Sequence, residues 1–290
     1  MLESFHSHDR GNGIGMHLLP TKKYKTNQLA LYIRQPLVEE DYTKVALIPS
    51  VLKRGTVKYP TAQKIKQRLD DLYGASLQVD VQKRGEEQVA IFRLQIANEN
   101  YLSEKVPLLE EGMELLAQII TQPLVEEGVF SEKHVELEKD ILKRKLAQLK
   151  DDKIRYANKR CVEEMYKGER YGLFANGSLE ALEEITAENL FHYYQQMITS
   201  HPLDFFVVGD VKETQVIELF DRYFKLARSP QPASAPEERK VNRNKEQVII
   251  EETEIAQGKL HIGCRTHTTY KDDDYIALLV ANGVFGGFSH

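Results

Sequence analysis

Apolar residues alternate with polar ones in several short stretches of the chain, and this spacing predicts strands that bury one face. The clearest example is a hairpin in which Leu77, Val79 and Val81 alternate with polar residues, a polar turn lies near Gly85, and a second apolar stretch returns. The expected strands cover residues 15–19, 29–34, 77–81, 89–96 and 205–211.

Longer stretches place apolar residues every three or four positions, which predicts amphipathic helices. Gly74 stands where a left-handed C-cap belongs, and Ser131 and Thr186 stand where N-caps belong. Pro49 is unfavourable inside the first helix, because it removes a backbone donor. The expected helices cover residues 43–53, 61–73, 103–121, 131–150, a following segment to about 166, 187–197 and 216–223.

The order of elements near the start of the chain recurs near its end. Asp41-Tyr42 precedes an apolar helix that follows two strands, and Asp274-Tyr275 does the same after expected strands at 247–250 and 259–264. A stretch rich in proline and small residues, 229–236, separates the two copies and cannot build a core. We therefore expect a first domain at 1–228, a linker at 229–243 and the incomplete start of a second, homologous domain at 244–290.

The composition is that of a globular protein, with 41% hydrophobic and 29% charged residues. A net charge of -5 argues against a protein that binds nucleic acid by neutralising phosphates. The two cysteines, Cys161 and Cys264, match no metal or redox spacing. The N-terminus lacks the basic-then-apolar order of a signal peptide, and no apolar run is long enough to cross a bilayer. These features predict a cytoplasmic protein without a membrane span.

Several short patterns, spread in order along the chain, carry a resemblance to a known family. They are Arg54-Gly55-Thr56, Gly74-Ala75, Glu138, Tyr171-Gly172 with Gly177, the strand 207–211, and Gly286-Gly287. Together they resemble the pitrilysin, insulinase and mitochondrial-processing-peptidase family, whose zinc motif is the inverted H-x-x-E-H. The resemblance implies an α+β protein of two homologous domains, each an antiparallel-rich mixed sheet packed with helices.

The metal-binding residues of that family are missing from this chain. Counting back from Gly55-Thr56, the two histidine ligands fall on Ala46 and Ser50 and the general base falls on Pro49. Counting on from Glu138, the third ligand falls on Lys145. None of these side chains is a serviceable zinc ligand, and neither H-x-x-E-H nor H-E-x-x-H occurs anywhere in the chain. We expect no cofactor, no metal and no catalysis by this chain alone.

The resemblance implies a non-catalytic subunit that pairs with a homologous subunit carrying an intact zinc motif, and that helps to hold an extended peptide. Family members take up peptide at an edge strand, by adding a strand to the sheet. The expected strand here consists of Leu77, Gln78, Val79, Asp80 and Val81, although Gln78-Val79 replaces the family's Asn-Ala. One alternative is a peptide- or protein-binding scaffold in a complex without proteolysis. A second, an active zinc peptidase, is disfavoured by the absent motif.

Two other candidates are open to more than one interpretation. His6 and His8 could chelate a metal ion, but a flexible terminus is favoured. The basic run 143–145 is expected to be a solvated helix face paired with Glu138 and Asp140, whereas the sharper hypothesis points Lys145 into the vacated zinc position.

Overall fold

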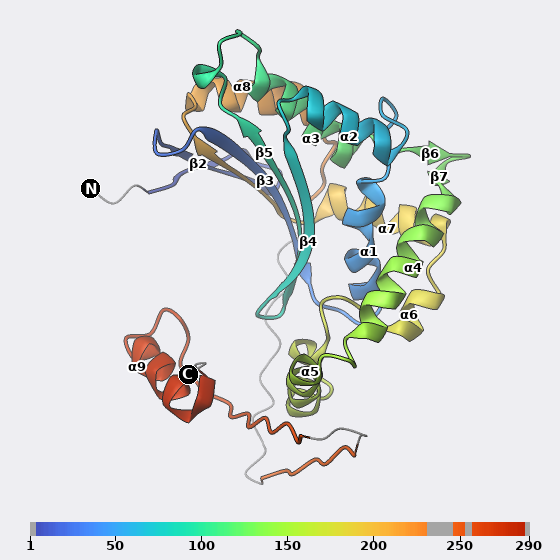
Figure 1. Cartoon of the computed structure of the whole chain (residues 1–290), viewed down its shortest axis with the longest axis vertical. Helices are drawn as coiled ribbons and strands as arrows, with labels where there is room; N and C mark the ends of the chain where they lie inside the picture. The colour runs from blue at the N-terminus through green and yellow to red at the C-terminus, as the bar shows by residue number, and fades with distance from the viewer. Residues whose placement is uncertain (1–3, 231–245, 253–256, 288–290) are drawn as a thin grey trace.

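The computed structural model describes residues 4–230, 246–252 and 257–287, and its main body is one sheet with a layer of helices (Figure 1). The strands of this sheet are β1 (His6–Asp9), β2 (Ile14–Pro20), β3 (Thr26–Pro36), β4 (Ser76–Arg84), β5 (Glu87–Ala97) and β8 (Leu203–Gly209). The helices are α1 (Tyr42–Leu52), α2 (Ala62–Asp71), α3 (Leu108–Thr121), α4 (Glu132–Gln148), α5 (Lys153–Met165), α6 (Leu179–Glu183), α7 (Ala187–Ser200), α8 (Glu213–Tyr223) and α9 (Tyr275–Asn282). Smaller elements are the ribbon β6 (Val125–Glu126) and β7 (Val129–Phe130), the single turns η1 (Glu99–Tyr101) and η2 (Arg170–Gly172), and the π-type turn η3 (Gly283–Gly287).

The six strands lie in the order β1-β2-β8-β3-β5-β4. Every neighbouring pair is antiparallel except β2 and β8, which are parallel. The sheet is therefore mixed and mostly antiparallel, and together with its helices it confirms the predicted α+β class. The order also makes β1 and β4 the two edges, because each pairs with one neighbour only.

Helices cover one face of this sheet and leave the other open. In β8, Leu203, Phe205 and Val207 are buried, whereas the alternate residues Asp204 and Phe206 are partly exposed. Figure 1 shows α2, α3 and α8 over one end of the covered face and α1 and α7 over the other end. One continuous hydrophobic core fills the space between the sheet and this helical layer. Among the described residues, the other face carries the partly exposed alternate residues of the strands.

The structure reproduces most of the expected strands and helices and corrects four details. Helix α3 begins at Leu108, later than expected. Pro107 stands at its N-cap, and a proline disfavours helical backbone angles at the residue before it. Ser131 precedes α4 but its side chain makes no cap hydrogen bond, whereas Thr186 forms a reciprocal capping box with Asn189. Pro49 lies inside α1, which remains one helix.

The expected flexible N-terminus is the third correction, because His6 and His8 belong to strand β1. The side chains of both histidines reach the carboxylate of Glu213 on α8, His6 Nδ1 at 2.6 Å and His8 Nε2 at 3.1 Å. Backbone pairing with β2 and these two contacts hold the segment on the sheet. The sequence gives a weak local signal here, since the stabilising partner lies more than 200 residues away.

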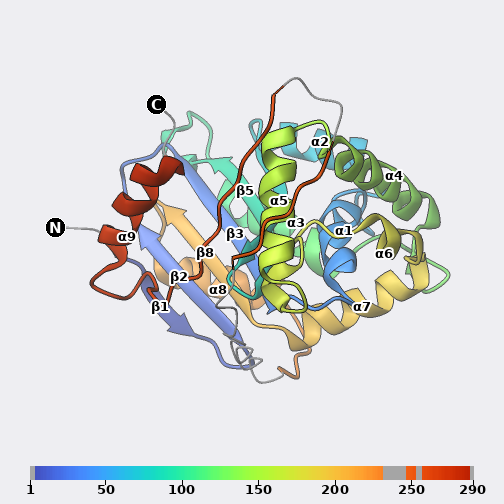
Figure 2. The same ribbon diagram turned by 90° about the horizontal axis from the view of Figure 1, so that it is seen from below.

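The fourth correction concerns the expected strands 247–250 and 259–264, which form no strand in the described residues. Strands need a partner for their backbone groups, and neither segment is paired in a ladder. Both run as extended chain beside α5 (Figure 2), where Glu251 bonds Arg160 at 2.6 Å and Arg265 bonds Glu169 at 2.6 Å. The expected helix after Asp274 is present as α9. Most of the expected linker, 231–243, lies outside the described residues.

A search of the described residues finds no helix with both the length and the apolar character needed to cross a bilayer.

Candidate functional site

Helix α1 carries three of the four positions at which the sequence patterns predict the family's zinc chemistry, namely Ala46, Pro49 and Ser50. It is enclosed by β4, β5, α4 and α7, and most of its residues are buried because the helix is apolar on nearly every side. Pro49 is buried, while Ala46 and Ser50, on neighbouring turns, are partly exposed. An alanine methyl group and a proline ring offer no lone pair, and a serine hydroxyl is a poor zinc ligand. This stretch of α1 functions as a packing element.

The segment after α1, residues 53–60, makes close backbone and side-chain contacts that hold the end of the helix in place. Thr56 is fully buried, its hydroxyl accepts the Tyr59 N–H at 2.9 Å, and its backbone bridges to Pro123. Gly55 approaches the neighbouring backbone so closely that a Cβ there would lie 2.8 Å from the carbonyl oxygen of Pro60. The Arg-Gly-Thr sequence that resembles the family is thus explained here by structure, with no metal involved.

Glu138 on α4 has a similar structural role. Its carboxylate is buried and forms an ion pair with the guanidinium of Arg54, which joins α4 to the end of α1. The expected pairing of the basic run with Glu138 and Asp140 side chains is therefore wrong. Lys143 instead bonds Glu183 on α6 at 3.1 Å, and Arg144 donates to the Asp140 backbone oxygen at 3.3 Å.

Lys145 lies two turns beyond Glu138, about 10 Å further along α4. Helices α1 and α4 run in opposite directions. Glu138 pairs with Arg54, beyond the C-terminal end of α1, while Ser178, two residues after the loop that Lys145 faces, donates its backbone N–H to Thr43 near the N-terminal end of α1. Lys145 is consequently on the side of the N-terminal half of α1. Its side chain is exposed, and neither Ala46 nor Ser50 lines the cavity that it faces. The hypothesis that Lys145 points to the expected zinc position at Ala46 and Ser50 stays a prediction.

The four positions taken together do not fit zinc. They supply a methyl group, a proline ring, a hydroxyl and an ammonium group, and the last repels a dication. Within the part of the chain that the structure describes, no three His, Cys, Asp or Glu side chains are placed to hold a metal ion. No hydrolytic step through a bound metal can therefore be assigned to this site.

Strand β4, which contains the expected peptide-binding residues, is an edge of the sheet. The two-residue turn after it makes Arg84 and Glu87 a hydrogen-bonded pair, so alternate residues of β4 bond β5 and the others face outward. The outward N–H of Val81 is bonded at 2.9 Å to the carboxylate of Asp80, as expected for a group without a strand partner. The residues that turn their backbone groups outward in this register are Leu77, Val79, Val81 and Lys83.

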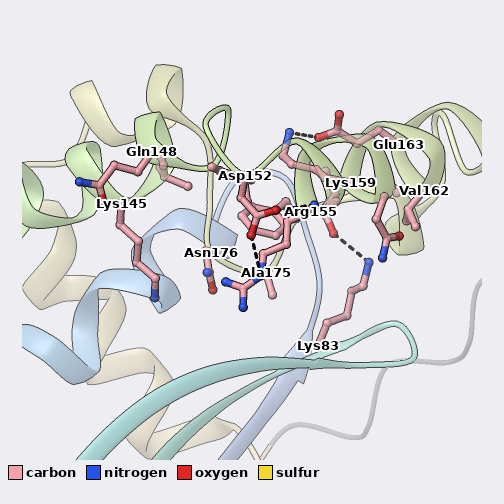
Figure 3. A pocket seen from close by; sticks show the side chains of 16 residues that line it. Lys83, Lys145, Gln148, Asp152, Arg155, Lys159, Val162, Glu163, Ala175 and Asn176 are labelled. Carbon is pink, nitrogen blue, oxygen red and sulfur yellow. Dashed lines mark hydrogen bonds and ion pairs between the residues drawn. The ribbon is translucent and has the colours of Figure 1, made fainter. Parts of the chain in front are cut away.

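A cavity of about 550 Å³ adjoins the end of β4 (Figure 3). Its walls are the C-terminal half of α4, the inner side of α5 and the loop 172–176, and Lys83 enters it from β4. In Figure 3, Lys145 points into the cavity from α4, on the opposite side from Lys83 in this view, and Asn176 lies between them. The cavity thus brings together residues from four separate parts of the chain.

The charged groups of the cavity are unbalanced. Four of the lining residues are cationic and two, Asp152 and Glu163, are acidic. Arg155 Nε pairs with Asp152 at 3.2 Å, and Lys159 forms an ion pair with Glu163. The two cations left over are Lys83 and Lys145.

Lys83 is held by neutral groups. Its Nζ donates to the backbone oxygens of Tyr171 at 2.9 Å and Leu173 at 3.3 Å, and it lies 4.2 Å from the centre of the Tyr171 ring. Burial lowers the pKa of Lys83, and the carboxylate of Glu163 opposes this shift. Among the described residues, no hydrogen bond or ion pair of Lys145 is found.

The open face of the sheet carries a second group of interacting side chains. The Phe206 ring stacks on His17 with centroids 4.6 Å apart and lies 5.0 Å from the ring of Tyr32. Beside them, Asp204 accepts from Arg34 Nε at 2.5 Å and lies 3.3 Å from His17 Nε2. This face therefore presents aromatic and charged groups where a core-facing sheet would present aliphatic ones.

The cavity was missed by reasoning from the sequence. Lys83 lies next to a turn and Arg155 and Lys159 lie on a highly charged helix, and such residues usually mark solvated surface. Only the approach of α5 and the loop 172–176 to the end of β4 gives them a common site. Lys145, the cation that lines the cavity from α4, was singled out in the sequence by its position relative to Glu138.

Comparisons with known proteins agree with this picture. A family model described as "Peptidase M16 inactive domain" matches residues 184–290. A Bacillus subtilis protein described as a probable inactive metalloprotease, YmfF, is 42% identical over 287 residues, which cover 96% of this chain and 65% of that protein. The chain thus spans 65% of the length of this curated relative.

Two solved structures have the same fold. A conserved protein from Enterococcus faecalis matches with a TM-score of 0.75 and 31% identity, over 80% of this chain and 54% of that one. A peptidase M16 inactive domain from Pseudomonas fluorescens matches with a TM-score of 0.64 and 16% identity, over 80% of this chain and 52% of that one. The second likeness concerns the fold alone.

Proposed function

We propose, from the likeness of this chain to inactive M16 metallopeptidase homologues, that it is the non-catalytic subunit of a heterodimeric zinc peptidase. In this proposal a homologous subunit supplies the zinc and the general base. The present chain contributes one wall of the chamber and holds an extended peptide at the β4 edge. Peptide cleavage then requires both subunits.

The observation that carries the proposal is the combination of a disabled zinc helix with an accessible sheet edge. Ala46, Pro49 and Ser50 cannot support hydrolysis, yet β4 keeps outward backbone groups that could pair with another strand. The sheet face opposite the helices is open and carries aromatic and charged side chains.

The test uses the protein at its natural length, alone and co-expressed with a homologue that contains an intact H-x-x-E-H. We expect no bound zinc and no peptidase activity for the protein alone, and a one-to-one complex that cleaves peptides. A Val79→Pro variant should weaken peptide binding by that complex, because it deletes an outward N–H and leaves the β4–β5 ladder intact. The matched control is Ser50→Ala, which alters a degenerate position on α1 without touching the edge.

Two results would contradict the proposal. Stoichiometric zinc with peptide cleavage by the isolated protein would show an active peptidase. A stable complex that binds peptides without ever cleaving them would favour the scaffold alternative.

A further inference from the structure

We propose that the cavity at the end of β4 binds a carboxylate group, from a side chain or from the C-terminus, of the peptide held on that strand. This inference rests on the proposed function, because it names the chemistry of a peptide bound at the same edge. Lys83 and Lys145 are the two groups that would recognise the carboxylate. Lys145 is also the expected position of the third zinc ligand, whereas Ala46, Pro49 and Ser50 do not line this cavity.

The cavity continues the surface of the edge strand. Lys83 belongs to β4 and turns its backbone groups outward, while its side chain enters the cavity. A peptide paired with Val79 and Val81 would therefore run past the cavity mouth at its next residues, since strand residues advance about 3.3 Å each. The volume of about 550 Å³ is within the usual range for small-molecule sites, so it can hold a side chain or a chain end.

The charge of the cavity favours an anion. Asp152 and Glu163 are each paired with a cation of α5, so both carboxylates are already neutralised. Glu163 also accepts from Arg160 at 2.8 Å, on the same helix. Lys83 and Lys145 have no such carboxylate partner among the described residues. The two unpaired cations enter the cavity from opposite sides in Figure 3, Lys145 from α4 and Lys83 from β4.

The hydrogen-bond capacity of the two lysines agrees with a carboxylate ligand. An ammonium group has three donors, and Lys83 uses two of them on the backbone oxygens of Tyr171 and Leu173. One donor of Lys83 is left, and the donors of Lys145 are free of intramolecular partners in the described part of the chain. The side-chain amide of Asn176 lies in the same wall. A carboxylate, with two oxygens that accept only, complements these donors.

The experiment measures the binding of fluorescein-labelled peptides to the full-length complex by fluorescence anisotropy. The probes are ten-residue threonine- and valine-rich peptides that differ at one position, glutamate or glutamine, each made with a free or an amidated C-terminus. We expect about tenfold tighter binding in one of two comparisons, either glutamate over glutamine or the free over the amidated C-terminus. A charge-assisted hydrogen bond would give a difference of this size. Loss on amidation assigns the C-terminal carboxylate, and loss on replacing glutamate assigns the side chain.

Lys145→Gln and Lys83→Gln should each reduce this preference, and the double variant should abolish it, without weakening the neutral peptide. Lys145 is exposed, so its variant remains informative if Lys83→Gln fails to fold. The matched control is Lys143→Gln, on the same helix but outside the cavity, which should keep the preference.

Three results would overturn the inference. Equal binding of all four peptides, or an equal effect of Lys143→Gln and Lys145→Gln, would refute the carboxylate site and leave the proposed function standing. Failure of every peptide to bind the complex would refute the proposed function, and the inference with it.

Discussion

The ion pair between Arg54 and Glu138 gives the sharpest test of how the disabled helix is held in place. The side chain of Glu138 is 8% exposed and that of Arg54 is 26% exposed, so the two partners are buried to different degrees. Removing one partner leaves the other without compensation, and a stranded buried charge is more costly than an exposed one. We therefore expect the loss of Arg54 to be more damaging than the loss of Glu138.

The expected magnitudes follow from this asymmetry. Arg54→Met, which keeps most of the alkyl chain, should lower the free energy of unfolding by about 3 kcal/mol. This value is at the low end of the range for breaking a buried ion pair, because water can reach the position that the partly exposed guanidinium occupies in the wild type. Glu138→Leu should cost about 1.5 kcal/mol, since Arg54 can turn toward water. The double variant should cost about 2 kcal/mol less than the two single effects together, which is the coupling expected for residues in contact.

The assay is urea unfolding followed by circular dichroism for the wild type, both single variants and the double variant. The exposed pair Lys66 and Asp70, whose side chains are 68% and 58% exposed, provides the control. Lys66→Met should change stability by less than about 0.5 kcal/mol. If the two single effects simply add, or if Glu138→Leu is the more damaging change, the reasoning about unequal burial is refuted.

The remaining predictions concern a close backbone approach and the N-terminal strand. Gly55→Ala should destabilise the protein by about 1–3 kcal/mol in thermal unfolding, because the new Cβ would lie 2.8 Å from the Pro60 oxygen, and a wild-type melting temperature would contradict the geometry. Contacts from His6 and His8 lower the pKa of Glu213, so its stabilising contribution is present above the normal carboxyl pKa and is lost as the pH falls through the lowered value. The protection factors of the β1 amides, corrected for intrinsic exchange, should therefore fall below about pH 4.5 in the wild type but not in this way in Glu213→Gln, and identical pH profiles would refute the role of these contacts.

Helices with a clear apolar period were predictable, and so was the family. Helix α7 illustrates why, because both its apolar stripe and its Thr186 capping box lie within a few residues of sequence. The resemblance to the M16 metallopeptidases depended on short patterns whose spacing survives in sequence, and the comparisons confirm it. Local information of this kind needs no knowledge of tertiary contacts.

Features that depend on distant partners were not predictable. Strand β1 has a polar sequence and is held by Glu213, which the linear order does not bring near. The stretch 247–250 has the apolar composition of a strand, but in the structure it has no strand partner and its side chains are exposed. The cavity joins Lys83 to Lys145, and no spacing rule relates residues so far apart in sequence.

The state of α1 also has an evolutionary consequence. Regaining the zinc chemistry would require new side chains at Ala46, Pro49, Ser50 and Lys145, and none of these changes is useful without the others. Pro49 is buried against close-packed neighbours, so a longer glutamate there would first disturb the core. A single substitution at any one of these positions would therefore leave the other three without zinc-binding chemistry, so a metal site here needs several simultaneous changes.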